Sequence, residues 1–421
     1  MVAEYLDTGD LRSLRLSSRS LRDCFLFTFV KRYFRVRRHL MTLDSLACLV
    51  AISQHGLFGR AMHTLAVTDS VVHGSLHGTD KATAERDLIH ESGLAALYLT
   101  EVFKNAVNCQ TVSIDTSAVE PTSYWGAAAL DRETRQSGRW YRAPIHYRMG
   151  IRQSIIVALT ESGASITTLG IAIGAVDAQT NWETAETTQF PKAYPDNRLT
   201  QSRWAKTLTK LDLDINFGPA LHDMAPSREF INLFPQLEDL YLHCAPWVWS
   251  RSTVRGRLAE VHELVEGSYS PRLRKLCIEG FKIQLDDLMA LLDTHRNTLQ
   301  KVELSLVAVY APNRDPWQRL LAMVRECLAG VESLSVGECY AVHMSDGFPG
   351  ATGSDTIREI HFERPDGQLS SAGQVLDNER SSFDRLIQGL RENEPGPEVI
   401  DEIMEWGSQM DESEDGGEEE G

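Results

Sequence analysis

The sequence LTKLDLDI at residues 208–215 decides the fold, because apolar residues recur in it with a fixed spacing. Leu208, Leu211 and Leu213 follow the pattern apolar, two residues, apolar, one residue, apolar, and LEDLYLH at 237–243 repeats it. Alternation over the last three positions is typical of a strand with one buried face. The pattern therefore predicts a short, half-buried strand at each occurrence.

The same pattern occurs at nine places along the chain. Its central residues are Leu65, Val112, Leu169, Leu211, Leu240, Leu276, Val302, Leu334 and Ile360. Successive centres lie 47, 57, 42, 29, 36, 26, 32 and 26 residues apart. The later values approach the period of leucine-rich repeats, which is about 20–29 residues. Segments between the patterns show helical spacing, as in Leu285, Leu288, Met289 and Leu292. Each strand–helix unit must stack on the next to cover its apolar face.

We therefore expect an α/β fold, an irregular leucine-rich-repeat solenoid in which parallel strands alternate with helices, over residues 42–363. Segments 116–150 and 174–205 do not fit the repeat, and we expect them to be insertions. Residues 364–410 are predicted to form a loop and two capping helices. The acidic, low-complexity segment 411–421 is predicted to be a disordered tail.

The N-terminal segment, residues 1–41, has a different pattern. It contains EYLD at 4–7, DLRSLRL at 10–16 and SLRD at 20–23, and these pieces resemble the middle and end of the F-box of many fungal F-box proteins. The following FRVR at 34–37 resembles the strand that opens the repeat domain of such proteins. The resemblance implies a short all-α segment before the repeats.

The resemblance also implies a partner, a Skp-type adaptor protein on which such helices dock. The residues that match the family's docking positions are Leu6, Leu11, Leu14, Leu16 and Leu21. The family's opening LP-x-E-I helix does not occur in this chain, so we expect a truncated F-box. The alternative interpretation is that the same leucines pack the helical segment against the first repeat.

Composition indicates a soluble globular chain, with 42% hydrophobic and 24% charged residues. No apolar run approaches the roughly 18 residues that span a bilayer, and the first residues lack the apolar stretch of a secretory signal. The 7 cysteines are scattered singly without a C-x-x-C pair, which is typical of reduced core residues. We therefore expect an intracellular protein, cytoplasmic or nuclear, that does not associate with membranes.

Charge is distributed unevenly. The net charge is −17, and the last 28 residues, from Glu394 onward, hold twelve acidic residues and no Lys or Arg. In the basic run at 31–38, Phe34 and Val36 alternate with Arg35 and Arg37. This alternation predicts a strand with an apolar buried face and a basic solvated face, and it is favoured over a nucleic-acid site.

No catalytic motif appears in the sequence. Phosphate-binding loops, dinucleotide fingerprints, zinc-protease motifs and nucleophile elbows are all missing, so we expect no cofactor, no metal site and no catalytic residue. A hydrolase site built from distant residues within 116–205 is a remote alternative, and it would need Ser or Cys, His and a carboxylate around one pocket.

The most promising surface follows from strand geometry. Residues between the apolar positions point to the open face of the sheet, where acidic and aromatic side chains would gather. The candidate partner-binding residues on this face are Asp212, Asp214, Tyr241, His243, Glu279, Glu303 and His361, with Trp247 and Trp249 as anchors just beyond one strand. We interpret the face as a site for a basic protein segment, and the alternative is an ordinary solvated sheet face.

These observations together favour a non-enzymatic protein-binding subunit. The resemblance to F-box proteins implies the substrate-recognition component of an SCF-type ubiquitin ligase. The alternative is a free-standing leucine-rich-repeat scaffold without ligase association.

Overall fold

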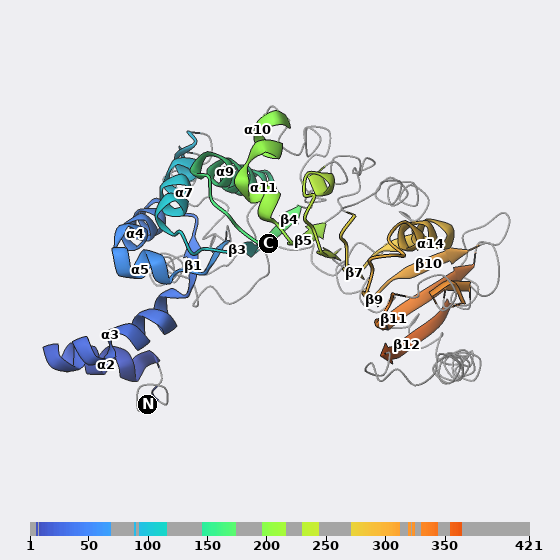
Figure 1. The fold of residues 1–421 in the computed structure, drawn as a ribbon, viewed down its shortest axis with the longest axis horizontal. Helices are drawn as coiled ribbons and strands as arrows, with labels where there is room; N and C mark the ends of the chain where they lie inside the picture. Colours follow the sequence, from blue (N-terminus) through green and yellow to red (C-terminus); the bar gives the residue numbers. More distant parts are fainter. Residues whose placement is uncertain are drawn as a thin grey trace, which may run out of the picture. The chain divides into compact units, whose positions relative to one another are not determined.

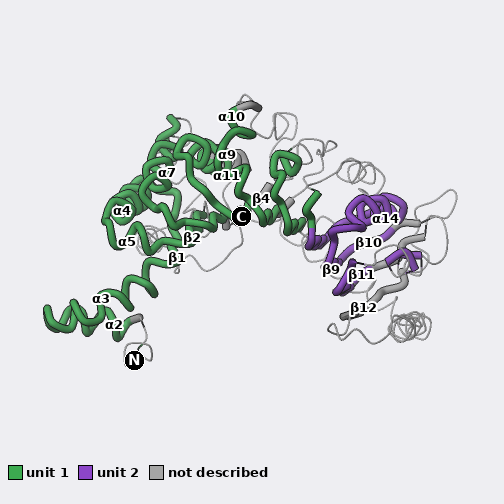
Figure 2. Tube along the Cα trace, viewed as in Figure 1, with its two compact units in different colours: residues 1–249, 269–273 green, residues 250–268, 274–421 purple. Residues whose placement is uncertain are grey.

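The computed structural model describes residues 6, 8–68, 88–89, 92–115, 145–173, 196–215, 230–243, 271–311, 319–320, 322–324, 330–343 and 354–363. The chain divides into two compact units (Figure 2). Unit 1 comprises residues 1–249 and 269–273, and unit 2 comprises residues 250–268 and 274–421. Both units contain helices and a sheet of mainly parallel strands, so the fold is α/β.

The sheet of unit 1 is parallel, and neighbouring strands follow one another in chain order. Its described strands are β1 (Val36–Leu40), β2 (Thr64–Thr68), β3 (Thr111–Asp115), β4 (Thr168–Ile173), β5 (Lys210–Ile215) and β6 (Asp239–His243). Sequential parallel order requires that every connection crosses over the same face, and helices provide these crossovers.

The helices described before the sheet are α2 (Thr8–Ser17) and α3 (Arg19–Phe34). The crossover helices described in unit 1 are α4 (Leu43–Gln54), α5 (Gly56–Ala61), α7 (Leu94–Asn105), α9 (Ile145–Ser162), α10 (Asp196–Gln201) and α11 (Arg203–Thr207). In Figure 1 these crossover helices follow one another along one side of the sheet. The start of α9 and all of α10 lie within the segments that the sequence marks as insertions.

The central apolar residues of the sequence pattern align across the sheet of unit 1. Leu65 lies beside Val112, Val112 beside Leu169, Leu169 beside Leu211, and Leu211 beside Leu240. All five are fully buried. Stacked in register, they form one continuous apolar row beneath the helices, which is why each unit needs its neighbour.

A repeated main-chain contact fixes this register. The carbonyl oxygen of the residue directly before a strand accepts hydrogen bonds from two successive N–H groups of the next unit. The accepting carbonyls in unit 1 belong to Arg35, His63, Gln110, Thr167 and Thr209, at N–O distances of 2.8 to 3.1 Å. Each strand is therefore positioned by its predecessor at its start, before the strand pairing itself begins.

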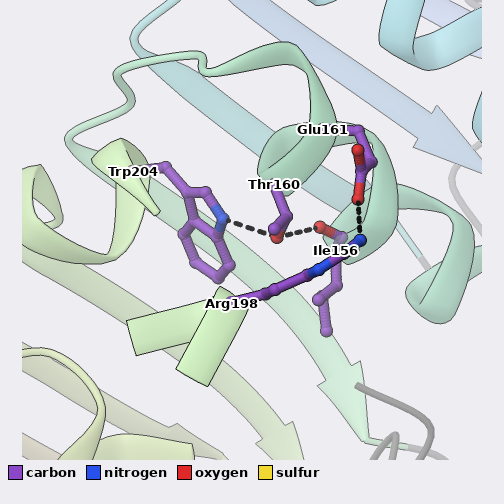
Figure 3. Close-up of polar contacts among 5 residues, drawn as sticks. All are labelled: Ile156, Thr160, Glu161, Arg198 and Trp204. Carbon is purple, nitrogen blue, oxygen red and sulfur yellow. Dashed lines mark hydrogen bonds and ion pairs between the residues drawn. The ribbon is translucent and has the colours of Figure 1, made fainter. Parts of the chain in front are cut away.

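Neighbouring crossover helices are also joined through side chains (Figure 3). The indole Nε1 of Trp204, in α11, donates to the hydroxyl of Thr160 in α9 at 3.2 Å, and this hydroxyl donates to the carbonyl of Ile156 at 2.8 Å. Trp204 is fully buried, and this hydrogen bond satisfies the one polar atom of its side chain. On the surface nearby, Arg198 pairs with Glu161 at 3.3 Å.

Unit 2 repeats the arrangement with bent strands. Its described elements are β7 (Lys275–Glu279), β8 (Lys282–Gln284), α14 (Leu285–Thr294), β9 (Lys301–Ser305), β10 (Ala308–Ala311), β11 (Ser333–His343) and β12 (Ser354–Glu363). Strand β9 lies between β7 and the first half of β11, and β10 lies between β8 and the second half of β11, all parallel. The central residues Leu276, Val302 and Leu334 are again in register.

The bends occur at two residues with positive φ, Gly280 at 77° and Leu306 at 52°. Each lies directly after a strand, β7 or β9, and each donates its N–H to the next strand, to Ser305 and Gly337 respectively, at 3.0 Å. Left-handed backbone is unfavourable for leucine, so this contact holds Leu306 in a strained conformation.

The ninth occurrence of the pattern was wrongly predicted to continue the parallel order. Strand β12 pairs with β11 in antiparallel orientation, with Leu334 opposite Phe362 and Val336 opposite Ile360. The apolar alternation of a strand is the same in either direction, so the pattern predicts the strand but does not determine its orientation. The predicted helices after residue 363 lie outside the described residues.

The prediction for the basic run at 31–38 holds for buried Phe34 and exposed Arg35 but is wrong for Val36 and Arg37. Arg37 is only 6% exposed, and Val36 is 47% exposed. Helix α3 extends to Phe34, so the alternation of the strand starts afresh at Val36. Arg37 consequently lies beside Leu65 in the apolar row.

Candidate functional site

The five leucines of the N-terminal segment have different environments. Leu11 is fully buried in a cluster with Phe29, Val30 and Phe34, and Leu6 packs against this cluster. Leu14 and Leu21 are partly buried. Leu16 is 79% exposed. Leu11 therefore stabilises the pair α2 and α3, whereas Leu16 is available to a partner.

Phe27, in α3, is a second large apolar side chain on this helix pair that faces solvent, with 73% of its surface exposed. Its exposure does not follow from the sequence, because Phe27 lies in the apolar run FLFTFV at 25–30, where periodicity does not separate core from surface. The name "helix-pair patch" is used below for Leu16 and Phe27. Large apolar side chains that face solvent are candidate contacts for another protein where they lie on one surface.

On the open face of unit 1, three predicted residues come together on β5 and β6. Asp212 and Tyr241 are direct cross-strand neighbours, and Asp212 Oδ1 lies 3.3 Å from His243 Nε2. The rings of Tyr241 and His243 lie nearly parallel with centroids 6.3 Å apart. The Lys210 ammonium, 4.2 Å from the Tyr241 ring centroid, makes a cation–π contact.

The corresponding face of unit 2 carries mixed charge. Glu303 Oε1 lies 3.0 Å from Lys275 Nζ and 2.9 Å from Lys301 Nζ. Partial burial opposes ionisation of Glu303, but the hydrogen bonds and charges of the two lysines outweigh it and lower its pKa. Glu279 lies on the neighbouring strand β7, opposite Ser305.

Lysines therefore accompany the acidic residues on both faces. Lys210, Lys275 and Lys301 occupy the first positions of β5, β7 and β9, and they are not among the residues predicted from the sequence. Each face therefore carries charges of both signs, and the face of unit 1 also has an aromatic centre, which suits hydrogen bonding and stacking with a polar peptide surface.

The remaining candidates are only partly placed. Asp214 lies in β5 opposite His243, and His361 lies in β12 opposite Ser335. Trp247 and Trp249 lie outside the described residues.

Two buried cysteines have environments that disfavour the reactive thiolate. Burial raises the pKa of Cys109 to about 12. Burial, reinforced by the negative charges of Glu303 and Glu279, raises the pKa of Cys277 to about 12. Both thiols stay protonated at neutral pH, so these two cysteines act as small core residues.

A buried polar cluster at β1 was not anticipated. Arg37 donates from Nη1 to the Tyr33 carbonyl at 3.3 Å, and Nη2 lies 3.3 Å from His39 Nε2. The other ring nitrogen of His39 lies 3.0 Å from the hydroxyl of Ser45. Burial, together with the charge of Arg37, lowers the pKa of His39 to about 3, so the ring is neutral at pH 7.

In the described part of the chain, no three His, Cys, Asp or Glu side chains are grouped to bind a metal ion. Among the same residues, no helix combines the length and the apolar character required to cross a bilayer. Comparison of the sequence with protein-family profiles gives no match, and comparison with curated proteins gives none either.

Proposed function

We propose that this protein is a non-catalytic protein-binding subunit that serves as the substrate-recognition component of an SCF-type ubiquitin ligase. In this proposal α2 and α3 are F-box-like helices that dock on a Skp-type adaptor, and the strand–helix units are an irregular leucine-rich-repeat solenoid that holds the target. The observation that carries the proposal is the helix-pair patch, two large apolar side chains at 79% and 73% exposure on the segment that resembles an F-box.

The stacked units support the solenoid part of the proposal. Their central leucines are in register, and successive units are joined by the repeated carbonyl contact. Rigid strands hold Asp212, Tyr241 and His243 in a fixed arrangement on an open face, and preorganisation of this kind lowers the entropic cost of binding a target.

Binding of a purified Skp-type adaptor to the full chain, measured by calorimetry, tests the proposal. We expect Leu16→Asp combined with Phe27→Asp to weaken binding by at least about tenfold, since such residues carry much of an interface's energy. Leu97→Asp is the matched control, because Leu97 is 66% exposed on α7, away from the F-box-like segment. An adaptor that does not bind the wild-type chain, or an equal loss in the control, would contradict the ligase assignment.

A free-standing leucine-rich-repeat scaffold is the second candidate. The complete burial of Leu11 within the cluster of α2 and α3 favours the scaffold, because this leucine stabilises the helix pair whether or not an adaptor binds. The scaffold is supported if the adaptor does not bind while the charged face still binds a partner.

A further inference from the structure

Strand β1 is the terminal strand of the sheet of unit 1, and among the described strands it pairs with β2 alone. The carbonyl of Arg35 accepts hydrogen bonds from His63 and Thr64, and the N–H of Met41 donates to Thr68. Main-chain groups of alternate residues point to opposite edges of a strand. Val36, Arg38 and Leu40 therefore direct their N–H and C=O groups to the edge away from β2.

This edge is open within the described residues, where no hydrogen bond is made to the outward main-chain groups of these three residues. An open edge presents alternating donors and acceptors at the spacing of another strand, and native proteins usually cover it or use it for pairing. Unit 1 thus offers a template for one additional strand.

The side chains around this edge are basic. Three cations are exposed here: Lys31 in the last turn of α3, Arg35 directly before β1 and Arg38 in the middle of β1. None of the three forms an ion pair with a described residue. Beneath them, the buried guanidinium of Arg37 contacts the Tyr33 carbonyl and the His39 ring, neither of which is an anion. Val36, between Arg35 and Arg38, contributes an exposed apolar side chain.

We propose that the basic edge, defined as Lys31, Arg35, Val36 and Arg38, binds an extended acidic segment of a partner protein by strand addition along β1. The partner's main chain pairs with Val36, Arg38 and Leu40. Val36 and Arg38 are two residues apart and so share one face of β1, while Arg37 and His39 lie on the other face. The partner therefore places carboxylates on the face of Arg38 and apolar side chains at the positions between them, so the segment it offers alternates apolar and acidic residues.

Charge alone would also suit a nucleic acid. A phosphate backbone has no N–H donors, however, and would leave the outward carbonyls of β1 unpaired. A peptide satisfies both the main-chain edge and the positive charge, and for this reason we commit to a protein segment. The proposal concerns a different surface from the helix-pair patch, so adaptor binding and peptide binding succeed or fail separately.

Fluorescence anisotropy of a labelled octapeptide of alternating valine and glutamate, titrated with the full chain, tests the proposal. We expect saturable binding that weakens by about tenfold when every second peptide nitrogen is methylated, since methylation removes one edge of donors. Substituting lysine for glutamate in the peptide should abolish binding. Equal affinity for the methylated peptide, or no binding of the unmodified one, would overturn strand addition.

The protein side is tested with Lys31→Glu combined with Arg38→Glu, for which we expect about tenfold weaker binding at low salt. Arg203→Glu combined with Lys206→Glu is the matched control, since both of these cations are exposed on α11, and it should bind as the wild type does. If the control variant loses as much peptide affinity, the effect comes from net charge alone and the proposed site is wrong. Tighter binding of a single-stranded DNA dodecamer than of the peptide would assign the basic edge to nucleic acid instead.

Discussion

Strands β1 and β5 belong to the same sheet, β1 at its end and β5 in its interior, and they differ in what they bury. In β5 the two core positions hold Leu211 and Leu213, both fully buried. In β1 the corresponding positions hold Arg37 and His39, which are 6% and 0% exposed. Leu211 lies between Leu169 and Leu240 of the two neighbouring strands, whereas the described strands give β1 one neighbour, β2.

The polar pair is tolerated because α3 and α4 supply suitable partners. The rings of Tyr33 and Phe34 lie with their centroids 5.4 Å from the Arg37 guanidinium carbon, and Ser45 contacts His39. Burial lowers the pKa of Arg37 from its usual value, so the charge is held at a cost in desolvation. The comparison teaches that position in the array, as well as the repeat pattern, determines which residues a core site accepts.

The strongest test of this comparison introduces an arginine into the core of an internal strand. Leu211→Arg places a guanidinium between Leu169 and Leu240, where neither neighbour offers a partner. We expect a loss of more than about 4 kcal/mol of unfolding free energy, measured by urea denaturation. Leu16→Arg, at an exposed site, is the control and should change stability little. A similar small loss for Leu211→Arg would show that the internal strands tolerate charge as β1 does.

The pH dependence of the unfolding free energy tests the contribution of His39. The pKa of His39 is about 3 in the folded chain, against 6.5 for an ordinary histidine, so unfolding takes up a proton between these two pH values. Stability contributed by the neutral ring is complete above pH 6.5 and falls as the pH decreases toward 3. We expect the wild type to lose about 2 kcal/mol more between pH 7 and pH 5 than His39→Gln, measured by urea midpoints. Equal losses in the two proteins would mean that His39 titrates normally.

Arg37→Met tests the cost of the buried guanidinium. We expect a gain of about 1 kcal/mol at pH 7, because an apolar side chain of similar length needs no desolvation. The substitution also removes the positive charge beside His39, so the pKa of His39 should rise, as followed by NMR titration. Arg38→Met, on the exposed side of the same strand, should leave this pKa unchanged. A destabilised Arg37→Met variant would indicate that the aromatic contacts outweigh burial.

The smallest effect is expected on the open face of the sheet. Asp212→Asn removes the charge that pairs with His243, and both side chains are substantially exposed. The stability change should stay below about 0.5 kcal/mol by the same urea assay. A larger loss would show that the pair of Asp212 and His243 stabilises the fold, and it would weaken the proposal that this face binds a partner.

The sequence pattern predicted the strands well and their surroundings less well. Centres such as Leu65 and Leu276 could be found because an apolar spacing reports burial directly. The contact of Lys210 with Tyr241 and the pairs of Glu303 with two lysines could not, since they depend on which residues of neighbouring strands lie opposite one another. Sequence spacing alone does not contain this register.

Helix ends limited the prediction in the same way. One residue of difference in where α3 ends exchanges the buried and exposed sides of β1, and so a strand predicted to bury Val36 buries Arg37. The orientation of β12 failed for a separate reason, because period-2 alternation has no direction. The helix-pair patch contained one predicted residue, Leu16, and one, Phe27, that an unbroken apolar run concealed.

The shared carbonyl before each strand has a consequence for how this chain accommodates length changes. The N–H groups of Thr167 and Thr168 donate to the carbonyl of Gln110, and this contact aligns β3 with β4. The alignment does not depend on the number of residues between the two strands. Intervals of 57 and 26 residues between centres are therefore compatible with the same stacking. Residues inserted or deleted between these hydrogen-bonded positions should therefore leave the stacking of the strands unchanged. Such an array can acquire new loops without losing its sheet.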